Sequence, residues 1–247
     1  MKPFHKAHSS AIFNLTITGV FLALSLIFFL LSHQKFFTWP IASSIGLKID
    51  LSTLFILPIF VSASIAYGIV ALIIRFILGP FLNPSISLEI DYFGNFILLF
   101  SSCIFIFLFL SFRYVFGFKK EAKTQIITED HKYKFDKKQA IKLMLNLLIS
   151  TFITSIILTI FNAFFFTPVF FKLFKLTDNI NPIDLAQQWL TNKKFKSFSL
   201  SLNYFVWAFV LYFPFNLVNF TITSILFYGI YLVMIKSHSK MKKSFKY

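Results

Sequence analysis

Six apolar runs, separated by polar or charged segments, constrain this chain more than any other feature of its sequence. Hydrophobic residues make up 57% of its 247 residues and charged residues only 13%, whereas a soluble domain carries about 25% charged residues. Only lipid can cover so much apolar surface. The first run has about 20 residues, enough for a helix to cross a hydrocarbon core of about 30 Å. The sequence therefore predicts an all-α polytopic membrane protein.

The runs predict a single membrane domain, folded as a bundle of six transmembrane helices. The expected helices span about residues 10–32, 50–64, 67–79, 91–118, 140–167 and 201–235. The second and third are shorter than a full span, and only residues 66–68 are free to turn between them, so we expect a tight hairpin of two short helices. Because the first run lacks a small-residue cleavage site at its end, we expect a permanent helix and no cleaved signal peptide.

The distribution of basic residues predicts which side of the membrane each segment occupies. With the N-terminus in the cytoplasm, sixteen basic residues lie inside and seven outside, and the positive-inside rule favours this orientation. Both termini are then expected in the cytoplasm. The expected external loops are 33–49, 80–90 and 168–200, and the expected cytoplasmic loop is 119–139.

The sequence offers little that an enzyme or a metal site would use. Its five histidines lie at the ends or in loops, and none has a second histidine at helical metal-ligand spacing. There is no phosphate-binding G-x-x-x-x-G-K-[ST] segment, and the single cysteine, Cys103, lies within an apolar run. We therefore expect no catalysis, no metal and no cofactor. The net charge of +15 comes from Lys clusters between apolar runs, so we expect no nucleic-acid partner.

Polar side chains inside the apolar runs are the candidate functional residues, because an unpaired polar group in hydrocarbon is costly. Arg75 either extends its guanidinium to the outer headgroups or faces an internal cavity. The amides in the runs are Asn95, Asn162, Asn216 and Asn219. Each either holds helices together or lines a pocket for a neutral ligand with many donors and acceptors. In the predicted orientation Asn95 and Asn162 lie toward the outer leaflet, the side from which an imported solute would arrive.

Two further features concern helix surfaces and helix starts. Gly19 and Ala23 form a small-x-x-x-small pair on the first helix, which lets another helix approach closely. The pair serves either packing within the chain or contact with a partner. Asp50, Glu89 and Asp91 stand at the starts of apolar runs, where the positive end of the helix dipole stabilises an acid, so we expect them to cap helices.

The order of these features resembles the substrate-binding membrane subunits, or S components, of energy-coupling factor (ECF) vitamin importers. The resemblance covers nearly the whole chain. Its motifs are the small face of the first helix, segment 46–52 (GLKIDLS) with Pro58 after it, Arg75 in a short third helix, segment 162–168 (NAFFFTP) and segment 214–219 (PFNLVN). The last two are similar to segments of riboflavin-specific members, in which P-F-N-L-x-K and an Asn near the end of helix five help to hold the ligand. Asn219 stands where those members have Lys.

The resemblance implies a six-helix subunit that binds a vitamin, riboflavin or a similar heterocycle, beneath its first external loop. Such a subunit joins a scaffold transmembrane protein and two ATPase subunits, and topples in the bilayer to release its cargo inside. Gly19 and Ala23 would contact the scaffold. The residues expected to bind the ligand are Lys48, Asn95, Asn162, Asn216 and Asn219.

Two other classes of protein remain open at this point. A structural or assembly protein without a ligand would use the amides only to join helices. A membrane-embedded lipid-modifying enzyme or an intramembrane protease would need Asp, His or paired Glu residues clustered inside helices, and the sequence shows none. An amide-rich pocket also fits several heterocycles, so the pattern leaves the ligand open.

Overall fold

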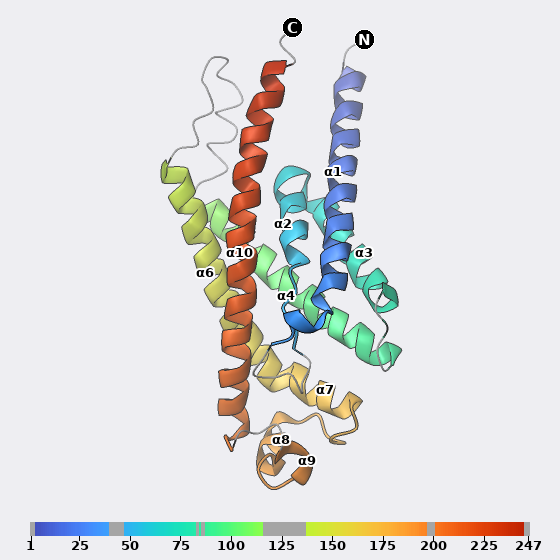
Figure 1. The fold of residues 1–247 in the computed structure, drawn as a ribbon, viewed down its shortest axis with the longest axis vertical. Coiled ribbons are helices and arrows are strands. Elements are labelled where there is room, and N and C mark those ends of the chain that lie inside the picture. The colour runs from blue at the N-terminus through green and yellow to red at the C-terminus, as the bar shows by residue number, and fades with distance from the viewer. Residues whose placement is uncertain are drawn as a thin grey trace.

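The described part of the chain is built from helices alone. The structure, a computed structural model, describes residues 3–39, 47–82, 84, 87–115, 137–196 and 201–244. Within these ranges no β-strand is present. The helices form an elongated bundle, shown in Figure 1.

Five helices of the described chain are long and apolar enough to cross a membrane. They lie in α1 (Pro3–Ser32), α3 (Ile65–Leu82), α4 (Leu88–Val115), α6 (Lys137–Phe161) with its continuation η3 (Asn162–Phe166) and α7 (Thr167–Leu173), and α10 (Tyr204–Ser244). The remaining apolar run forms α2 (Thr53–Ser62), whose 10 residues are too few to cross about 30 Å at about 1.5 Å per residue. The predicted class, an all-α polytopic membrane protein, is confirmed.

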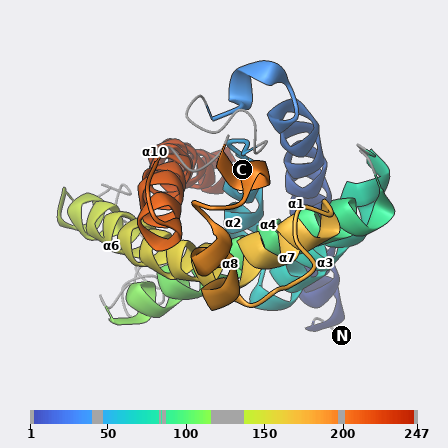
Figure 2. The same ribbon diagram turned by 90° about the horizontal axis from the view of Figure 1, so that it is seen from below.

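The short helix α2 lies inside the bundle. Every residue from Thr53 to Phe60 is buried, and the helix packs against α1, α3 and α10, as Figure 2 shows from below. A helix that is apolar all round is expected in such a position. Its turn into α3 lies at residues 63–64 instead of the expected 66–68. Gly68 lies so close to the ring of Phe60 that a Cβ would overlap it.

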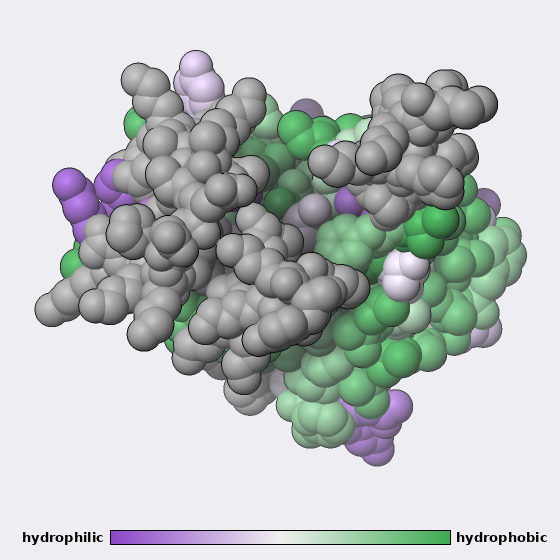
Figure 3. Space-filling view, turned by 90° about the horizontal axis from the view of Figure 1, so that it is seen from above, coloured by the Kyte–Doolittle hydropathy of each residue, from purple (hydrophilic) through white to green (hydrophobic). Residues whose placement is uncertain are grey.

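The outside of the bundle is apolar along most of its length. Large hydrophobic side chains on the long helices are exposed, among them Leu15, Phe107 and Ile225. Seen from above in Figure 3, hydrophobic residues dominate the described surface, and hydrophilic ones lie mainly at its edges. A soluble monomer rarely exposes so large an apolar surface. Lipid is the solvent that such a surface fits.

Polar side chains join helices where no water can reach them. On α6, Asn146 donates from Nδ2 to the carbonyl oxygen of Phe109 in α4 at 3.0 Å. One turn along, the hydroxyls of Thr151 and Ser224 lie 2.8 Å apart across the contact between α6 and α10. Interhelical hydrogen bonds of this kind hold membrane bundles together. These amide and hydroxyl groups, which are not among the candidate site residues, join α4, α6 and α10.

The segment expected as the loop 168–200 contains short helices. These are the end of α7, then α8 (Pro182–Gln188) and α9 (Lys193–Lys196). The side chain of Asn181 accepts a hydrogen bond from the N–H of Ile183 at 2.9 Å and so caps α8. Figure 1 shows α7, α8 and α9 at one end of the bundle, while α1 begins and α10 ends at the other. The two ends of the described chain therefore lie on the same side.

Candidate functional site

Between α1 and α2, residues 37–39 and 47–49 form two short antiparallel legs, called the hairpin below. The N–H of Trp39 donates to the carbonyl of Leu47 at 2.8 Å, and the N–H of Ile49 donates to that of Phe37 at 2.9 Å. Thr38 and Lys48 form an antiparallel bridge between the two legs. Lys48 is half-buried in its leg, and this burial lowers the pKa of its ammonium. Residues 40–46 of the expected external loop 33–49 lie outside the described residues.

Asp50 joins this hairpin to α2 and to α10. Its carboxylate accepts hydrogen bonds from the N–H and the hydroxyl of Ser52, each at 2.8 Å. The N–H of Asp50 donates to Oδ1 of Asn219 on α10 at 3.0 Å. Asp50 therefore stabilises the start of α2, as expected of an acid at a helix start. The side-chain oxygen of Asn219 therefore accepts a hydrogen bond from the protein backbone.

Arg75 is turned into the protein. Its side chain is only 3% exposed, and it donates from Nη1 to the hydroxyl of Ser52 at 2.8 Å and from Nη2 to that of Ser102 at 2.7 Å. Of the two expected positions, extension to the outer headgroups is therefore wrong. The guanidinium thus links α3 to the start of α2 and to α4. The hydroxyl of Ser52 accepts from Arg75 and donates to the carboxylate of Asp50, so it connects the two charged groups.

The predicted end of the fifth helix carries a π-helical turn, η3, in which the N–H of Thr167 donates to the carbonyl of Asn162 five residues back. The next N–H in such a ladder would come from residue 168 and reach Ala163. Residue 168 is proline, which has no N–H. The hydroxyl of Tyr204 supplies the missing donor to the carbonyl of Ala163 at 2.6 Å. π-helical turns are frequent at functional sites.

An aromatic cluster closes this end of the bundle. Its buried members from α7 to α10 are Phe171, Trp189, Phe195, Tyr204, Trp207 and Tyr212. Two residues of the hairpin, Trp39 and Leu47, pack against it. The ring of Trp39 also meets Phe215 of α10 edge to face, with centroids 5.9 Å apart. The hairpin, η3 and the first half of α10 thus share one aromatic surface.

Buried donors without a partner mark this region. Asn216 is 4% exposed, and its Nδ2 has no hydrogen-bond partner among the described residues. The indole Nε1 of Trp39 also has no partner among the described residues. The ring of Trp39 meets Phe215, the residue before Asn216. Leaving a buried donor unpaired costs about 1–3 kcal/mol. Such groups are rare in native proteins, and a ligand that accepts the hydrogen bonds is one physical explanation. Within the described ranges, Trp189 Nε1 and Thr154 Oγ1 are the other buried side-chain atoms without a hydrogen-bond partner.

Four of the five residues predicted to bind the ligand lie in the hairpin, in η3 or in the first half of α10, and the fifth, Asn95, lies elsewhere. Lys48 lies in the hairpin leg that leads to Asp50. Asn219 accepts the hydrogen bond of the Asp50 N–H, and Asn216 follows Phe215, whose ring meets Trp39 of the other leg. Asn162 lies on η3, which packs against α10, and its Nδ2 donates to the carbonyl of Leu158 at 2.8 Å. Asn95 lies apart from them, between α3 and α4.

Asn95 fills the contact between these two helices. Its Nδ2 donates to the carbonyl of Asp91 at 2.8 Å, and its Oδ1 lies where a Cβ on Gly79 would be.

Sequence reasoning left out Trp39 Nε1 and Tyr204 as site groups. A buried indole or phenol that needs a hydrogen-bond partner is the signal that could have found them.

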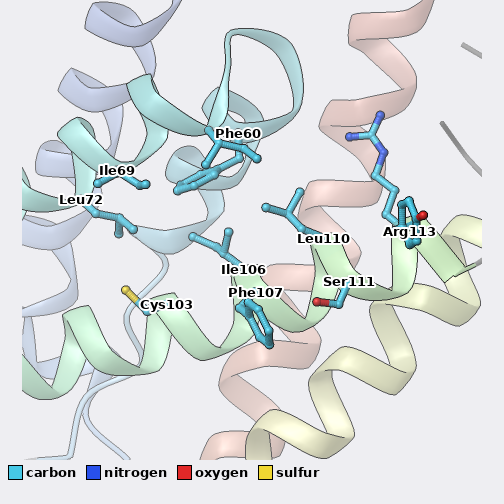
Figure 4. A pocket seen from close by; sticks show the side chains of 11 residues that line it. Phe60, Ile69, Leu72, Cys103, Ile106, Phe107, Leu110, Ser111 and Arg113 are labelled. Carbon is cyan, nitrogen blue, oxygen red and sulfur yellow. The ribbon is translucent and has the colours of Figure 1, made fainter. Parts of the chain in front are cut away.

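A cavity of about 650 Å³ opens elsewhere, between α2, α3 and α4. Figure 4 shows Phe60, Leu72 and Ile106 turned into it, with Cys103 on the α4 side and Arg113 at one end. None of the predicted ligand-binding residues lines this cavity. Its walls are mainly apolar, so it fits lipid chains better than a polar solute. Among the described residues, no three His, Cys, Asp or Glu side chains are grouped as metal ligands would be.

The small residues of α1 lie on its outer surface. Gly19 and Ala23 are exposed, and a Cβ on Gly19 would meet no atom within 4 Å. The inner side of the same helix carries Ser25, which is fully buried and donates to the carbonyl of Ser52 at 2.9 Å. The pair of small residues therefore does not pack against another described helix of this chain.

Comparison with known proteins adds one finding. The family model described as "ECF transporter, substrate-specific component" matches residues 13–231. No curated protein and no solved structure matches the chain. The family match runs from α1 to α10 and includes the hairpin, η3 and the surface where they meet. The chain therefore belongs to the family of substrate-specific components of ECF transporters.

Proposed function

We propose that this membrane protein captures a flat, neutral heterocycle, riboflavin or a close analogue, between its hairpin, η3 and the first half of α10. Members of its family are substrate-binding transporter subunits and not enzymes, and they act with scaffold and ATPase subunits. This membership removes the lipid-modifying enzyme from consideration. The proposal concerns which solute the subunit takes and which residues hold it.

The unpaired amide of Asn216 carries this proposal. A buried Nδ2 without a partner is stabilised by an acceptor from outside the chain, and a flavin offers carbonyl oxygens and ring nitrogens as acceptors. The indole N–H of Trp39 is a second donor of the same kind nearby. Neutral donors suit a neutral ring because neither partner buries a charge.

The aromatic surface supports a flat ligand. Trp39 and Phe215 stand beside the unpaired donors, and rings of this kind stack on planar heterocycles at distances that favour offset or edge contacts. Lys48 and Asn162 stand at the margin of the same region and are proposed as further contacts. Asn95 lies between α3 and α4, against Gly79 and away from this region, and the oxygen of Asn219 accepts the hydrogen bond of the Asp50 N–H. Neither is therefore proposed as a ligand contact.

We infer that the end with α7, α8 and α9 faces outward and that both termini face the cytoplasm. The excess of basic residues on the terminal side supports this orientation. The exposed face of Gly19 and Ala23 is then proposed to contact the scaffold subunit, because small residues allow a helix to approach closely.

Purification in mild detergent tests the choice of solute. If the proposal is right, the protein carries a yellow ligand with flavin absorbance, or the ligand-free protein quenches flavin fluorescence on titration with riboflavin. Thiamine and biotin serve as controls, since both differ from a flavin in shape and in hydrogen-bonding groups. A colourless protein that ignores riboflavin and binds one of the controls would assign it to another solute.

A further inference from the structure

Asn219 and Asn216 are the two side-chain amides of α10, and the oxygen of Asn219 has a partner in another segment. That oxygen accepts the hydrogen bond of the Asp50 N–H at 3.0 Å, across 169 positions of the sequence. We propose that Asn219 is a positioning residue, which fixes Asp50 and so holds the hairpin leg 47–49 beside Asn216. The effect on solute binding rests on the proposed function, whereas the effect on the hairpin does not.

Asp50 is a junction with several supports. Its carboxylate accepts hydrogen bonds from the N–H and the hydroxyl of Ser52. Ser52 in turn receives a hydrogen bond from Arg75 of α3 at its hydroxyl and one from Ser25 of α1 at its carbonyl. Two helices, α1 and α3, therefore fix the position of this turn. The hydrogen bond that the Asp50 N–H donates to Asn219 adds α10, the helix that carries Asn216.

The spacing along α10 gives this junction its consequence. Asn216 and Asn219 are three residues apart, so they share one face and lie about 4.5 Å apart along the helix axis. The Asp50 N–H is bonded to Asn219. The leg just before Asp50, residues 47–49, pairs with the leg 37–39 through the backbone N–H groups of Ile49 and Trp39. The indole of Trp39 then meets the residue before Asn216. Fixing Asp50 therefore orders the unpaired donors Asn216 Nδ2 and Trp39 Nε1 before a solute arrives, and such preorganisation increases affinity.

The chemistry at position 219 follows from this role. Asp50 offers an N–H, so residue 219 must accept. Aspartate keeps an acceptor oxygen at the same distance from the backbone, leucine has the same size without an acceptor, and lysine is a donor only. Lysine, expected here from the riboflavin-specific pattern, would therefore release Asp50 in this chain.

Hydrogen–deuterium exchange at the Asp50 amide tests the proposal on the full-length, ligand-free protein in detergent. Loss of one hydrogen bond in Asn219→Leu should speed this exchange by about 3- to 10-fold. Asn219→Asp should restore slow exchange, and Asn219→Lys should behave like leucine. Amides of α6 serve as an internal reference, because a loss of overall stability would speed them as well. Asn216→Ala is the matched control and should leave the Asp50 amide unchanged.

The second measurement is the rate of riboflavin dissociation by stopped-flow fluorescence. Asn219→Leu should release riboflavin about 3- to 10-fold faster than wild type, with rescue by Asn219→Asp. Unchanged exchange at Asp50 in Asn219→Leu would overturn the proposal, and so would faster exchange with an unchanged dissociation rate. If wild type does not bind riboflavin at all, the proposed solute is wrong, and the exchange result alone then decides whether Asn219 positions Asp50.

Discussion

The hydroxyl of Tyr204 donates a hydrogen bond to the carbonyl of Ala163 at 2.6 Å and so ties the start of α10 to the π-helical turn η3. Pro168 makes this bond necessary, because it removes the donor that would otherwise reach Ala163. A second phenol also contacts this segment, since the hydroxyl of Tyr212 accepts a hydrogen bond from the hydroxyl of Thr167 at 2.7 Å. The widened turn is thus held by two tyrosines of α10, on the surface proposed to bind the solute.

Tyr204→Phe should therefore destabilise the protein by about 1–3 kcal/mol, because the carbonyl of Ala163 is left buried without a donor. Thermal unfolding in detergent, followed by circular dichroism, measures the change. Tyr228→Phe, on the same helix, removes a hydroxyl that makes no hydrogen bond to the described residues and should stay within about 0.5 kcal/mol of wild type. Equal melting temperatures for Tyr204→Phe and wild type would show that water replaces the phenol.

Asn216→Ala should weaken binding of riboflavin by about 1–3 kcal/mol, or roughly 5- to 150-fold, because a polar atom of the ligand loses its donor. The stability of the ligand-free protein should change little, since Nδ2 has no partner in the described structure to lose. Isothermal titration of the purified protein measures the affinity.

Asn95→Ala is the comparison for this experiment. Its amide fills the contact between α3 and α4 at Gly79, so we expect a loss of stability with little change in affinity. Affinity that falls with Asn95→Ala and not with Asn216→Ala would move the site to the other side of the bundle.

The main helices could be predicted from the sequence because long apolar runs have one stable solution in lipid. Contacts between distant residues could not. Nothing in a single sequence says that Asn219 meets Asp50 or that the guanidinium of Arg75 finds Ser102, because the apolar runs give only length and not rotation about each helix axis. The same limit applies to Asn95, whose sequence context does not differ from that of an amide in a pocket.

The short helices α8 and α9 could not be predicted from the sequence either. Segment 168–200 is polar enough to read as a loop, yet α8 forms around the cap at Asn181 and is held by the burial of Trp189 against Trp207. Such a cluster depends on which aromatic residues meet in space. The excess of Phe in the chain hides that signal, because most phenylalanines face lipid or a generic core.

Stability should depend on pH through His33, which follows α1. Burial lowers the pKa of His33 below its ordinary value of 6.5, although the hydrogen bond to the carbonyl of Phe29 opposes this shift. Below about pH 6.5 the unfolded chain therefore takes up a proton that the folded protein resists, and the contribution of His33 is lost as the pH falls through its lowered value. The difference in melting temperature between wild type and His33→Gln should shrink from pH 7.5 to pH 5. A difference that grows toward acid pH would contradict this.

The proposed orientation predicts opposite labelling of two introduced cysteines. In a Cys103→Ser background, Lys194→Cys lies on α9, at the end of the bundle proposed to face outward, and should react with a membrane-impermeant maleimide on intact cells. Lys123→Cys, which lies outside the described residues, should react only after the membrane is permeabilised. Labelling of both positions on intact cells would show that the count of basic residues misassigns one side.

The exposed small face of α1 predicts a separation of binding from assembly. A leucine at Gly19 meets no atom of this chain within 4 Å of its Cβ, so Gly19→Leu should fold and bind solute as wild type does. If a scaffold helix lies against this face, the added side chain holds the two helices apart, and copurification of the scaffold and uptake in cells should both be lost. Gly229→Leu is the matched control, because Gly229 on α10 has equally open surroundings, and it should leave assembly intact. Loss of assembly in both variants would mean that any bulk on the lipid-facing surface interferes. Assembly that survives Gly19→Leu would place the scaffold contact on another helix.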